Sequence, residues 1–326
     1  MIERWRTSRP SSAHARALPR RAALLPASNT LHGAVAATWL GHSTVLLQFA
    51  DVTVLTDPVW AHRVSPVSFA GPVRWVPPML ALADLPRIDF VLQSHNHYDH
   101  FDRAATRELA HRNPRATWCV PLGMAPAVRR CGVGDVREFD WWNGAALRVL
   151  TAHGEEMVRV DAVPAQHFSG RGLADRDRSL WCGWTVAANG ARVYFAGDSG
   201  YHPQFGEIAQ RCGPFDLMIL PIGAYEPRWF MSRVHMNPGE AVAAWRTMSD
   251  VQREHHGLPP SPLLGVHWGT YRLTDEPMDE PPVRTREHWQ NAGLPDGLLW
   301  LLAHGETRRL SIPAPASLPV ASARDR

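Results

Sequence analysis

The sequence predicts an α/β protein in which two mixed β-sheets are flanked by helices. Strand-forming runs outnumber helical runs, and the helical runs are interspersed among them along the chain. Neither a G-x-G-x-x-G nor a Walker motif is present. Several apolar strands end directly before a histidine or an aspartate. This pattern favours two sheets with helices outside them over one regularly alternating doubly wound sheet.

The first half of the chain is dominated by expected strands. The runs 44–49 and 52–56, separated by a short turn, predict a hairpin. A strand at 88–93 precedes a helix at 102–112, for which Asp102 is the expected N-cap. The remaining elements expected here are strands at 117–121, 136–139, 146–151 and 158–164, and a short helix at 124–131.

The second half repeats this mixture. Strands at 181–187 and 192–196 are expected to pair across the turn Asn189-Gly190. Asn237 is the expected cap of a helix over 238–248, and 249–262 is interpreted as a Pro-rich extension. The other expected elements are strands at 217–221, 263–266, 298–302 and 307–311, and a helix at 287–292.

Composition predicts one ordered domain at 37–312 between two loose ends. Residues 1–36 form an Arg-rich segment expected to be disordered, and 313–326 are rich in Pro, Ala and Ser. The 4 cysteines form no C-x-x-C pair, which indicates a reducing compartment, and no apolar run is long enough to span a bilayer. We therefore expect a cytoplasmic protein. Its formal charge of +3 permits an anionic partner without requiring one.

The stretch Ser94-His95-Asn96-His97-Tyr98-Asp99-His100 contains four potential metal ligands after an apolar strand. Imidazole and carboxylate groups suit zinc and its first-row neighbours. Because alternate residues of an extended chain point the same way, His95 and His97 can bind one ion together. Asp99 and His100 follow where the chain turns, so they can reach a second ion. The alternative is a loop that is rich in histidine by chance.

Three later strands also end at a potential ligand, namely His167, Asp198 and His267. The expected assignment places His95, His97 and His167 on one ion, places Asp99, His100 and His267 on the other, and makes Asp198 the bridge. Each ion then keeps a position for a shared water, as in catalytic sites. Two Zn²⁺ per chain are expected, and Mn or Fe would also suit these ligands. His42 and His304 are expected to orient metal ligands by hydrogen bonds, without binding the ions themselves.

The order His-x-His-x-Asp-His, His167, Asp198, His267 resembles the metallo-β-lactamase superfamily. That resemblance implies a four-layer αβ/βα sandwich with two zinc ions at one edge. The β-lactamases themselves match poorly because they use a cysteine ligand. Glyoxalase II also matches poorly, because Phe101-Asp102 stands where that enzyme has Gly-Gly.

Further motifs resemble the N-acyl-phosphatidylethanolamine-hydrolysing phospholipase D family over residues 38–310. The most specific block is Gly213-Pro214-Phe215-Asp216-Leu217, continued by residues 221–231. The other blocks are Trp39–Val45, Leu55–Pro58, Val120–Gly123, Asp140–Trp142, Phe195–Tyr201, His267–Thr270, Glu280–Pro282 and His304–Glu306. The chain departs from the animal members at Val234, which replaces a polar residue, and in its short Arg-rich N-terminal segment.

The resemblance implies hydrolysis of a phospholipid phosphodiester by a metal-bridging hydroxide, giving phosphatidic acid and an N-acylethanolamine. Asp99 and Asp198 would hold and orient the hydroxide, and His235 or Tyr225 would stabilise the leaving alkoxide. The residues expected to contact substrate are Tyr225, Arg228, Trp229, Phe230, Met231 and His235. A peripheral contact with a membrane and a homodimer are compatible with this reading.

Two other functions remain open from the sequence. One is a dizinc hydrolase of another ester, such as a lactone, a sugar-phosphate lactone, or a small or nucleic phosphodiester. Nucleic acid is not an expected partner, because no patch combines basic and aromatic residues. The other is a metal-binding scaffold without catalysis, although a scaffold has no need of an open two-ion site.

Overall fold

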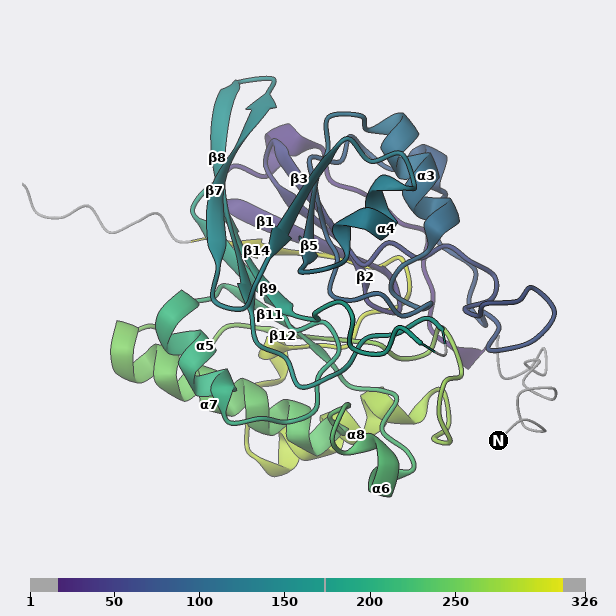
Figure 1. Ribbon diagram of the computed structural model, residues 1–326. Helices are drawn as coiled ribbons and strands as arrows, with labels where there is room; N and C mark the ends of the chain where they lie inside the picture. The colour runs from purple at the N-terminus through teal and green to yellow at the C-terminus, as the bar shows by residue number, and fades with distance from the viewer. Residues whose placement is uncertain (1–16, 173, 313–326) are drawn as a thin grey trace, which may run out of the picture.

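The computed structural model describes residues 17–172 and 174–312, which form two seven-stranded mixed sheets (Figure 1). The first sheet has the order β14-β1-β2-β3-β4-β5-β6, and the second has the order β13-β12-β11-β10-β9-β8-β7. The strands of the first sheet are β1 (Ala34–Gly41), β2 (Thr44–Phe49), β3 (Val52–Thr56), β4 (Phe90–Leu92), β5 (Thr117–Pro121), β6 (Asp135–Phe139) and β14 (Thr307–Ser311). Those of the second are β7 (Gly144–Thr151), β8 (Gly154–Val163), β9 (Gly183–Ala188), β10 (Ala191–Phe195), β11 (Leu217–Pro221), β12 (Leu263–Val266) and β13 (Leu299–Trp300).

The main core lies between the two sheets. Leu47 and Trp39 from the first sheet share one buried cluster with Trp184 and Val193 from the second. Every residue of β2 is buried because both faces of that strand are covered, whereas exposed and half-buried residues alternate along most of the edge strand β7. The four-layer sandwich expected from the sequence is therefore confirmed.

Helices cover the outer faces of both sheets. α3 (Arg103–Arg112) and α4 (Ala125–Arg129) pack on the first sheet, and the long α7 (Pro238–His256) covers the second beside α5 (Gln204–Cys212) and α8 (Glu280–Asn291) (Figure 1). Asp102 caps α3 as expected, because its side chain accepts hydrogen bonds from the backbone N–H groups of Ala104 and Ala105.

Two helical predictions need correction, and two helices were not predicted. α7 continues to His256, so most of the expected extension at 249–262 is helix, and buried Ser249 and Gln252 anchor it. Gly257 then ends the helix with a φ of 65°. α8 starts at Glu280, seven positions before the expected start, because Pro281 and Pro282 occupy a first turn that needs no N–H donors. α5 and the one-turn helix α6 (Arg228–Met231) were not predicted.

The expected boundary at residue 36 is wrong for the residues that the structure describes. Leu18 and Leu31 are buried, and the backbone N–H of Arg21 donates to the carbonyl of His304 over 2.8 Å. Packing therefore begins before β1. The expectations for 1–16 and 313–326 concern residues outside the described part of the chain. Among the described helices, none is both long and apolar enough to cross a bilayer.

Candidate metal centre

The potential ligands converge at one edge of the sandwich because their strands run parallel there. β3 pairs with β4 in parallel, as β10 does with β11 and β11 with β12. The carboxyl ends of parallel neighbours meet at the same edge, so the segments that follow them lie together. The loop 94–100 follows β4, Asp198 follows β10, and His267 follows β12.

His95, His97 and His167 form a first group whose ring nitrogens lie within 4.8 Å of one another. His97 Nδ1 is 2.8 Å from His95 Nε2 and 3.3 Å from His167 Nε2. The other ring nitrogen of His167, Nδ1, lies 2.9 Å from the carbonyl oxygen of Val234. That contact assigns the proton to Nδ1 and leaves Nε2 free to bind a metal.

Asp99, His100 and His267 form a second group, and His42 joins it. Asp99 Oδ2 lies 3.4 Å from His100 Nε2 and 3.6 Å from His267 Nε2. His42 Nε2 lies 2.9 Å from the same oxygen. His42 thus occupies the place of a residue that orients Asp99, as its sequence position suggested.

Asp198 lies between the two groups. Its Oδ2 is 3.0 Å from His100 Nε2 and 3.2 Å from His267 Nε2 in the second group. The same oxygen is 3.8 Å from His167 Nε2 and 3.9 Å from His95 Nε2 in the first. One carboxylate therefore reaches both groups, which is the placement that a bridging ligand requires.

The residues fit a pair of metal ions. His100 Nε2, both ring nitrogens of His267 and Asp198 Oδ1 are buried and make no hydrogen bond of normal geometry with a described residue. Each buried polar atom left this way costs about 1–3 kcal/mol, so several together indicate that the site is built to bind a cation. Nitrogen and oxygen donors suit Zn, Mn or Fe alike, so the donor set defines a binuclear site without selecting the metal.

Burial and charge prepare the ligands for metal binding. Burial lowers the pKa of His97 to about 4 and the pKa of His167 to about 3, so both imidazoles are neutral and have a lone pair available. Burial also opposes charge on His267, but the Asp198 and Asp99 carboxylates outweigh it and raise its pKa to about 9. The carboxylates thus create a field that favours positive charge at this edge.

Asp57 binds the metal-ligand loop, and this contact was not predicted from the sequence. Its fully buried carboxylate accepts four hydrogen bonds. Oδ1 accepts from Gln93 Nε2 over 2.8 Å and from Ser94 N over 2.7 Å, while Oδ2 accepts from Ser94 Oγ and from His100 Nδ1 over 2.5 and 2.7 Å. Asp57-Pro58 was interpreted only as a strand end, although a carboxylate ending the strand beside the ligand strand was a usable signal.

His304 does not touch a ligand. Its Nε2 lies 3.0 Å from Thr270 Oγ1, its Nδ1 lies 3.1 Å from the carbonyl of Pro19, and its ring packs on Trp39. Thr270 Oγ1 in turn accepts the backbone N–H of His42 over 2.7 Å. The expectation that His304 orients a ligand directly is therefore wrong, since two residues separate it from Asp99.

Two expected substrate residues are bound to other side chains. The hydroxyl of Tyr225 donates to Glu280 Oε1 over 2.6 Å, and burial raises its pKa. Arg228 Nη2 donates to both oxygens of Glu240 at 2.8 Å. Neither group is free for substrate in this arrangement. A leaving-group role for Tyr225 and a substrate contact through Arg228 are thus not supported.

His235 and the aromatic residues before it occupy different environments. His235 is buried, and its Nε2 lies 4.0 Å from Asp198 Oδ2, within reach of the centre. Trp229 and Phe230 are 82% and 56% exposed on α6, while Met231 is half-buried. The structure therefore brings His235 to the metal centre and leaves Trp229 and Phe230 on the surface.

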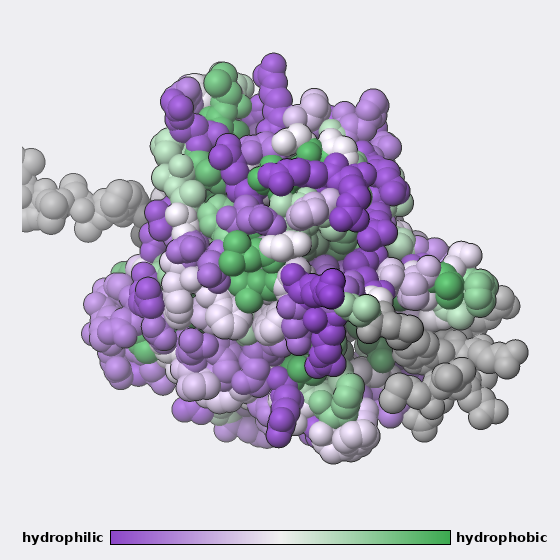
Figure 2. Space-filling model, viewed as in Figure 1, coloured by the Kyte–Doolittle hydropathy of each residue, from purple (hydrophilic) through white to green (hydrophobic). Residues whose placement is uncertain are grey.

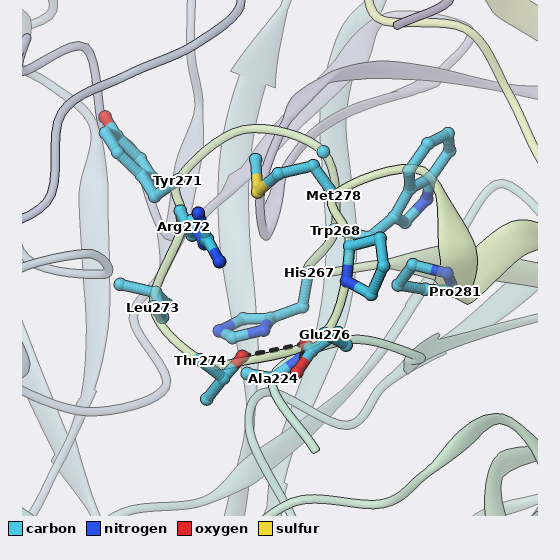
Figure 3. A pocket seen from close by; sticks show the side chains of 12 residues that line it. Ala224, His267, Trp268, Tyr271, Arg272, Leu273, Thr274, Glu276, Met278 and Pro281 are labelled. Carbon is cyan, nitrogen blue, oxygen red and sulfur yellow. Dashed lines mark hydrogen bonds between the residues drawn. The ribbon is translucent and has the colours of Figure 1, made fainter. Parts of the chain in front are cut away.

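A small cavity of about 10 Å³ lies beside His267, with room for roughly one water (Figure 3). Glu276 fixes its base, since its Oε1 accepts from Thr274 Oγ1 over 2.8 Å and from the backbone N–H of Ala224 over 2.7 Å. Arg272 also lines this cavity. Its exposed side chain forms no ion pair among the described residues.

Residues 52–268 match the Beta-lactamase superfamily domain, which covers more than half of the chain. The chain therefore belongs to the metallo-β-lactamase superfamily, as the resemblance implied. Within it, the chain is 42% identical over 258 residues to N-acyl-phosphatidylethanolamine-hydrolyzing phospholipase D 1 of Caenorhabditis elegans, covering 77% of this chain and 68% of the worm protein.

Two other proteins are similar to the chain, one in sequence and one in structure. An uncharacterized protein of Mycobacterium tuberculosis is 44% identical over 252 residues, covering 77% of this chain and 63% of that protein. A metallo hydrolase of the archaeon Ignicoccus hospitalis has a similar structure, with a TM-score of 0.60 and 21% identity. That match covers 85% of this chain and 98% of the archaeal one, and it shows a shared fold.

Proposed function

We propose that this protein is a metal-dependent phosphodiesterase that hydrolyses N-acyl-phosphatidylethanolamine or a similar lipid to phosphatidic acid and an N-acylethanolamine. The observation that carries the proposal is the Asp198-centred pair of ligand groups in a chain 42% identical to the worm phospholipase D. Two bound ions, zinc in the first instance, would supply Lewis acidity and an activated water.

The residues around the centre support distinct roles. Asp198 would bridge the ions, and Asp99, held by His42, would bind one ion and orient the water. Burial lowers the pKa of His235 to about 3, so its ring is neutral and can offer an N–H to a leaving oxygen. The Nδ1 atom of that ring has no partner among the described residues. His235 is therefore preferred to Tyr225 for stabilising the leaving alkoxide.

A lipid substrate requires access to a membrane surface, and α6 supports such a contact. Trp229 and Phe230 are exposed there, Arg233 is exposed three residues later, and His235 follows at the metal centre. Exposed aromatic and arginine side chains suit the bilayer interface. The face drawn in Figure 2 is otherwise largely polar, with small apolar patches.

Vesicle sedimentation tests this contact. The double variant Trp229→Ser/Phe230→Ser should sediment less with anionic vesicles and turn over vesicle lipid more slowly, while its turnover of bis(p-nitrophenyl) phosphate stays unchanged. Equal sedimentation of the variant and the wild type would remove α6 as the membrane contact. A change in oligomeric state instead would assign the aromatic pair to an interface between two copies.

A second candidate is a hydrolase of a smaller ester, such as a lactone. The observation in its favour is that Trp229 and Phe230 lie on the surface, so they do not line a closed groove for an acyl chain.

One panel separates the two candidates. Protein of measured metal content is assayed with N-acyl-phosphatidylethanolamine, a lactone and bis(p-nitrophenyl) phosphate. Lipid turnover that disappears in His97→Ala supports the phospholipase proposal. Turnover of the lactone alone would replace it with the second candidate, and two bound ions without any turnover would favour a metal-binding scaffold.

A further inference from the structure

The segment 168–172, at the start of the loop 168–179, packs against the metal-ligand loop 94–100 through one arginine. Arg171 Nη1 lies 2.8 Å from the carbonyl oxygens of both Asn96 and Phe101, and 3.3 Å from that of His97. The guanidinium carbon is also 3.8 Å from the centre of the Tyr98 ring. A single side chain thus contacts the backbone on both sides of Asp99 and His100.

The contact is reciprocal. The hydroxyl of Tyr98 donates to the carbonyl of Arg171 over 3.0 Å, and the backbone N–H of Gly170 donates to Asn96 Oδ1 over 2.8 Å. The two loops are therefore joined by side chain-to-backbone bonds in both directions. Phe168, which begins the loop, packs its ring against His97 and His167, with centroid separations of 4.5 and 4.9 Å.

The arginine loop is braced by its own aspartates. Asp175 Oδ1 accepts from the backbone N–H groups of Arg171 and Gly172 over 3.0 and 2.7 Å. Asp177 accepts from Ser169 N over 3.2 Å, and its own N–H donates to the Ser169 carbonyl over 2.9 Å. Hydrogen bonds to the backbone of Ser169, Arg171 and Gly172 therefore anchor the residues around Arg171.

We propose that Arg171 is a positioning residue of the metal centre, which holds the 94–100 loop in its metal-binding shape. Its guanidinium attracts the carbonyls of Asn96, His97 and Phe101 to one side of the loop. The ring nitrogens of His95 and His97 converge on the other ligands. A planar guanidinium can serve several acceptors while it stacks on a ring, which a lysine ammonium cannot do. The proposal rests on the metal site and is independent of the choice of substrate.

Arg171→Met removes every donor while it keeps an extended apolar side chain over Tyr98. Loss of a residue that supports metal ligands costs about 10–100-fold in metal affinity. We expect Zn²⁺ affinity to fall within that range in Arg171→Met and by less in Arg171→Lys. Arg178→Met is the matched control, because Arg178 lies on the same loop with its side chain exposed. The control should retain wild-type affinity.

Zn²⁺ affinity is measured by competition with a chromophoric chelator, together with the melting temperature of each metal-free protein. Lower affinity with an unchanged metal-free melting temperature supports the proposal. Wild-type affinity in Arg171→Met, or equal losses in Arg171→Met and Arg178→Met, would overturn it. If Arg171→Met does not fold, Arg171→Lys decides, and wild-type affinity in that variant contradicts the proposal. Absence of lipid turnover in all proteins would refute the phospholipase activity alone.

Discussion

The two ligand groups of the metal centre are supported in different ways. His100, in the second group, donates to buried Asp57 at the end of β3, and Asp99 contacts buried His42. His167, in the first group, is oriented by the carbonyl of Val234, and the loop carrying His97 is held by Arg171. His100 is therefore supported from the sheet, whereas His97 and His167 are supported by loops. His95 shares the support of the sheet, because its Nδ1 lies 2.9 Å from Ser94 Oγ, which donates to Asp57. Loss of the support of the first group should lower the metal affinity. Loss of the support of the second should lower the free energy of unfolding as well.

The largest effect is expected from Asp198→Asn, which weakens both groups at once. The amide is nearly the same size but lacks the charge that offsets two cations. Phosphodiester turnover should fall at least about 100-fold. Turnover of bis(p-nitrophenyl) phosphate is the measurement, and Asp250→Asn is the control, because Asp250 pairs with Arg253 on α7 and contacts no metal ligand in the described residues. Activity within a few-fold of wild type would show that Asp198 does not join the two groups in one catalytic centre.

Asp57→Asn tests the support of the second group. The amide nitrogen would replace one of two oxygens that each accept two hydrogen bonds, so buried donors lose a partner in either orientation. The free energy of unfolding should fall by about 1–3 kcal/mol, even without metal. Denaturant unfolding of the metal-free protein measures this. An unchanged midpoint would show that the sheet does not support His100 in this way.

Glu240→Gln tests the support of the first group. Glu240 binds Arg228 with both oxygens, and Arg228 also donates to the carbonyl of His235 over 3.1 Å. The segment from Arg228 to His235 includes Val234, whose carbonyl orients His167. Because Glu240→Gln weakens the hold on Arg228, this segment should orient His167 less well. We expect Zn²⁺ affinity to fall by roughly a few-fold, less than for direct support residues. A large fall in the free energy of unfolding with normal Zn²⁺ affinity would contradict the expectation that support of the first group affects mainly metal binding.

Arg272→Gln should have the smallest effect, because this residue supports neither group. Its exposed guanidinium lines the cavity beside His267, and we expect it to contact a charged substrate oxygen that approaches the metal centre from that side. Loss of one charge-assisted hydrogen bond corresponds to about 1.5–3 kcal/mol at most, and exposure reduces it, so KM should rise up to about 10-fold while kcat is retained. Steady-state kinetics would show instead a fall in kcat if Arg272 acted on the metal ligands.

The same comparison explains what the sequence could predict. Strand ends followed by a histidine or aspartate identified both ligand groups, because parallel strands bring their ends together. The supporting residues were harder to find. Asp57 is 43 residues from His100, and Arg171 is 74 residues from His97, so their contacts depend on the packing of loops. The start of α8 was also missed, because Pro281 and Pro282 are excluded from helix interiors but occur in a first turn, and only the fold shows which case applies.

The central claim is that Asp198 joins two ion-binding groups in one centre. Metal analysis of the purified, zinc-loaded protein and of His167→Ala tests it most directly. We predict two ions per chain in the wild type and about one in His167→Ala, since the second group remains intact. A single ion in the fully loaded wild type, or two retained in the variant, would contradict the binuclear account.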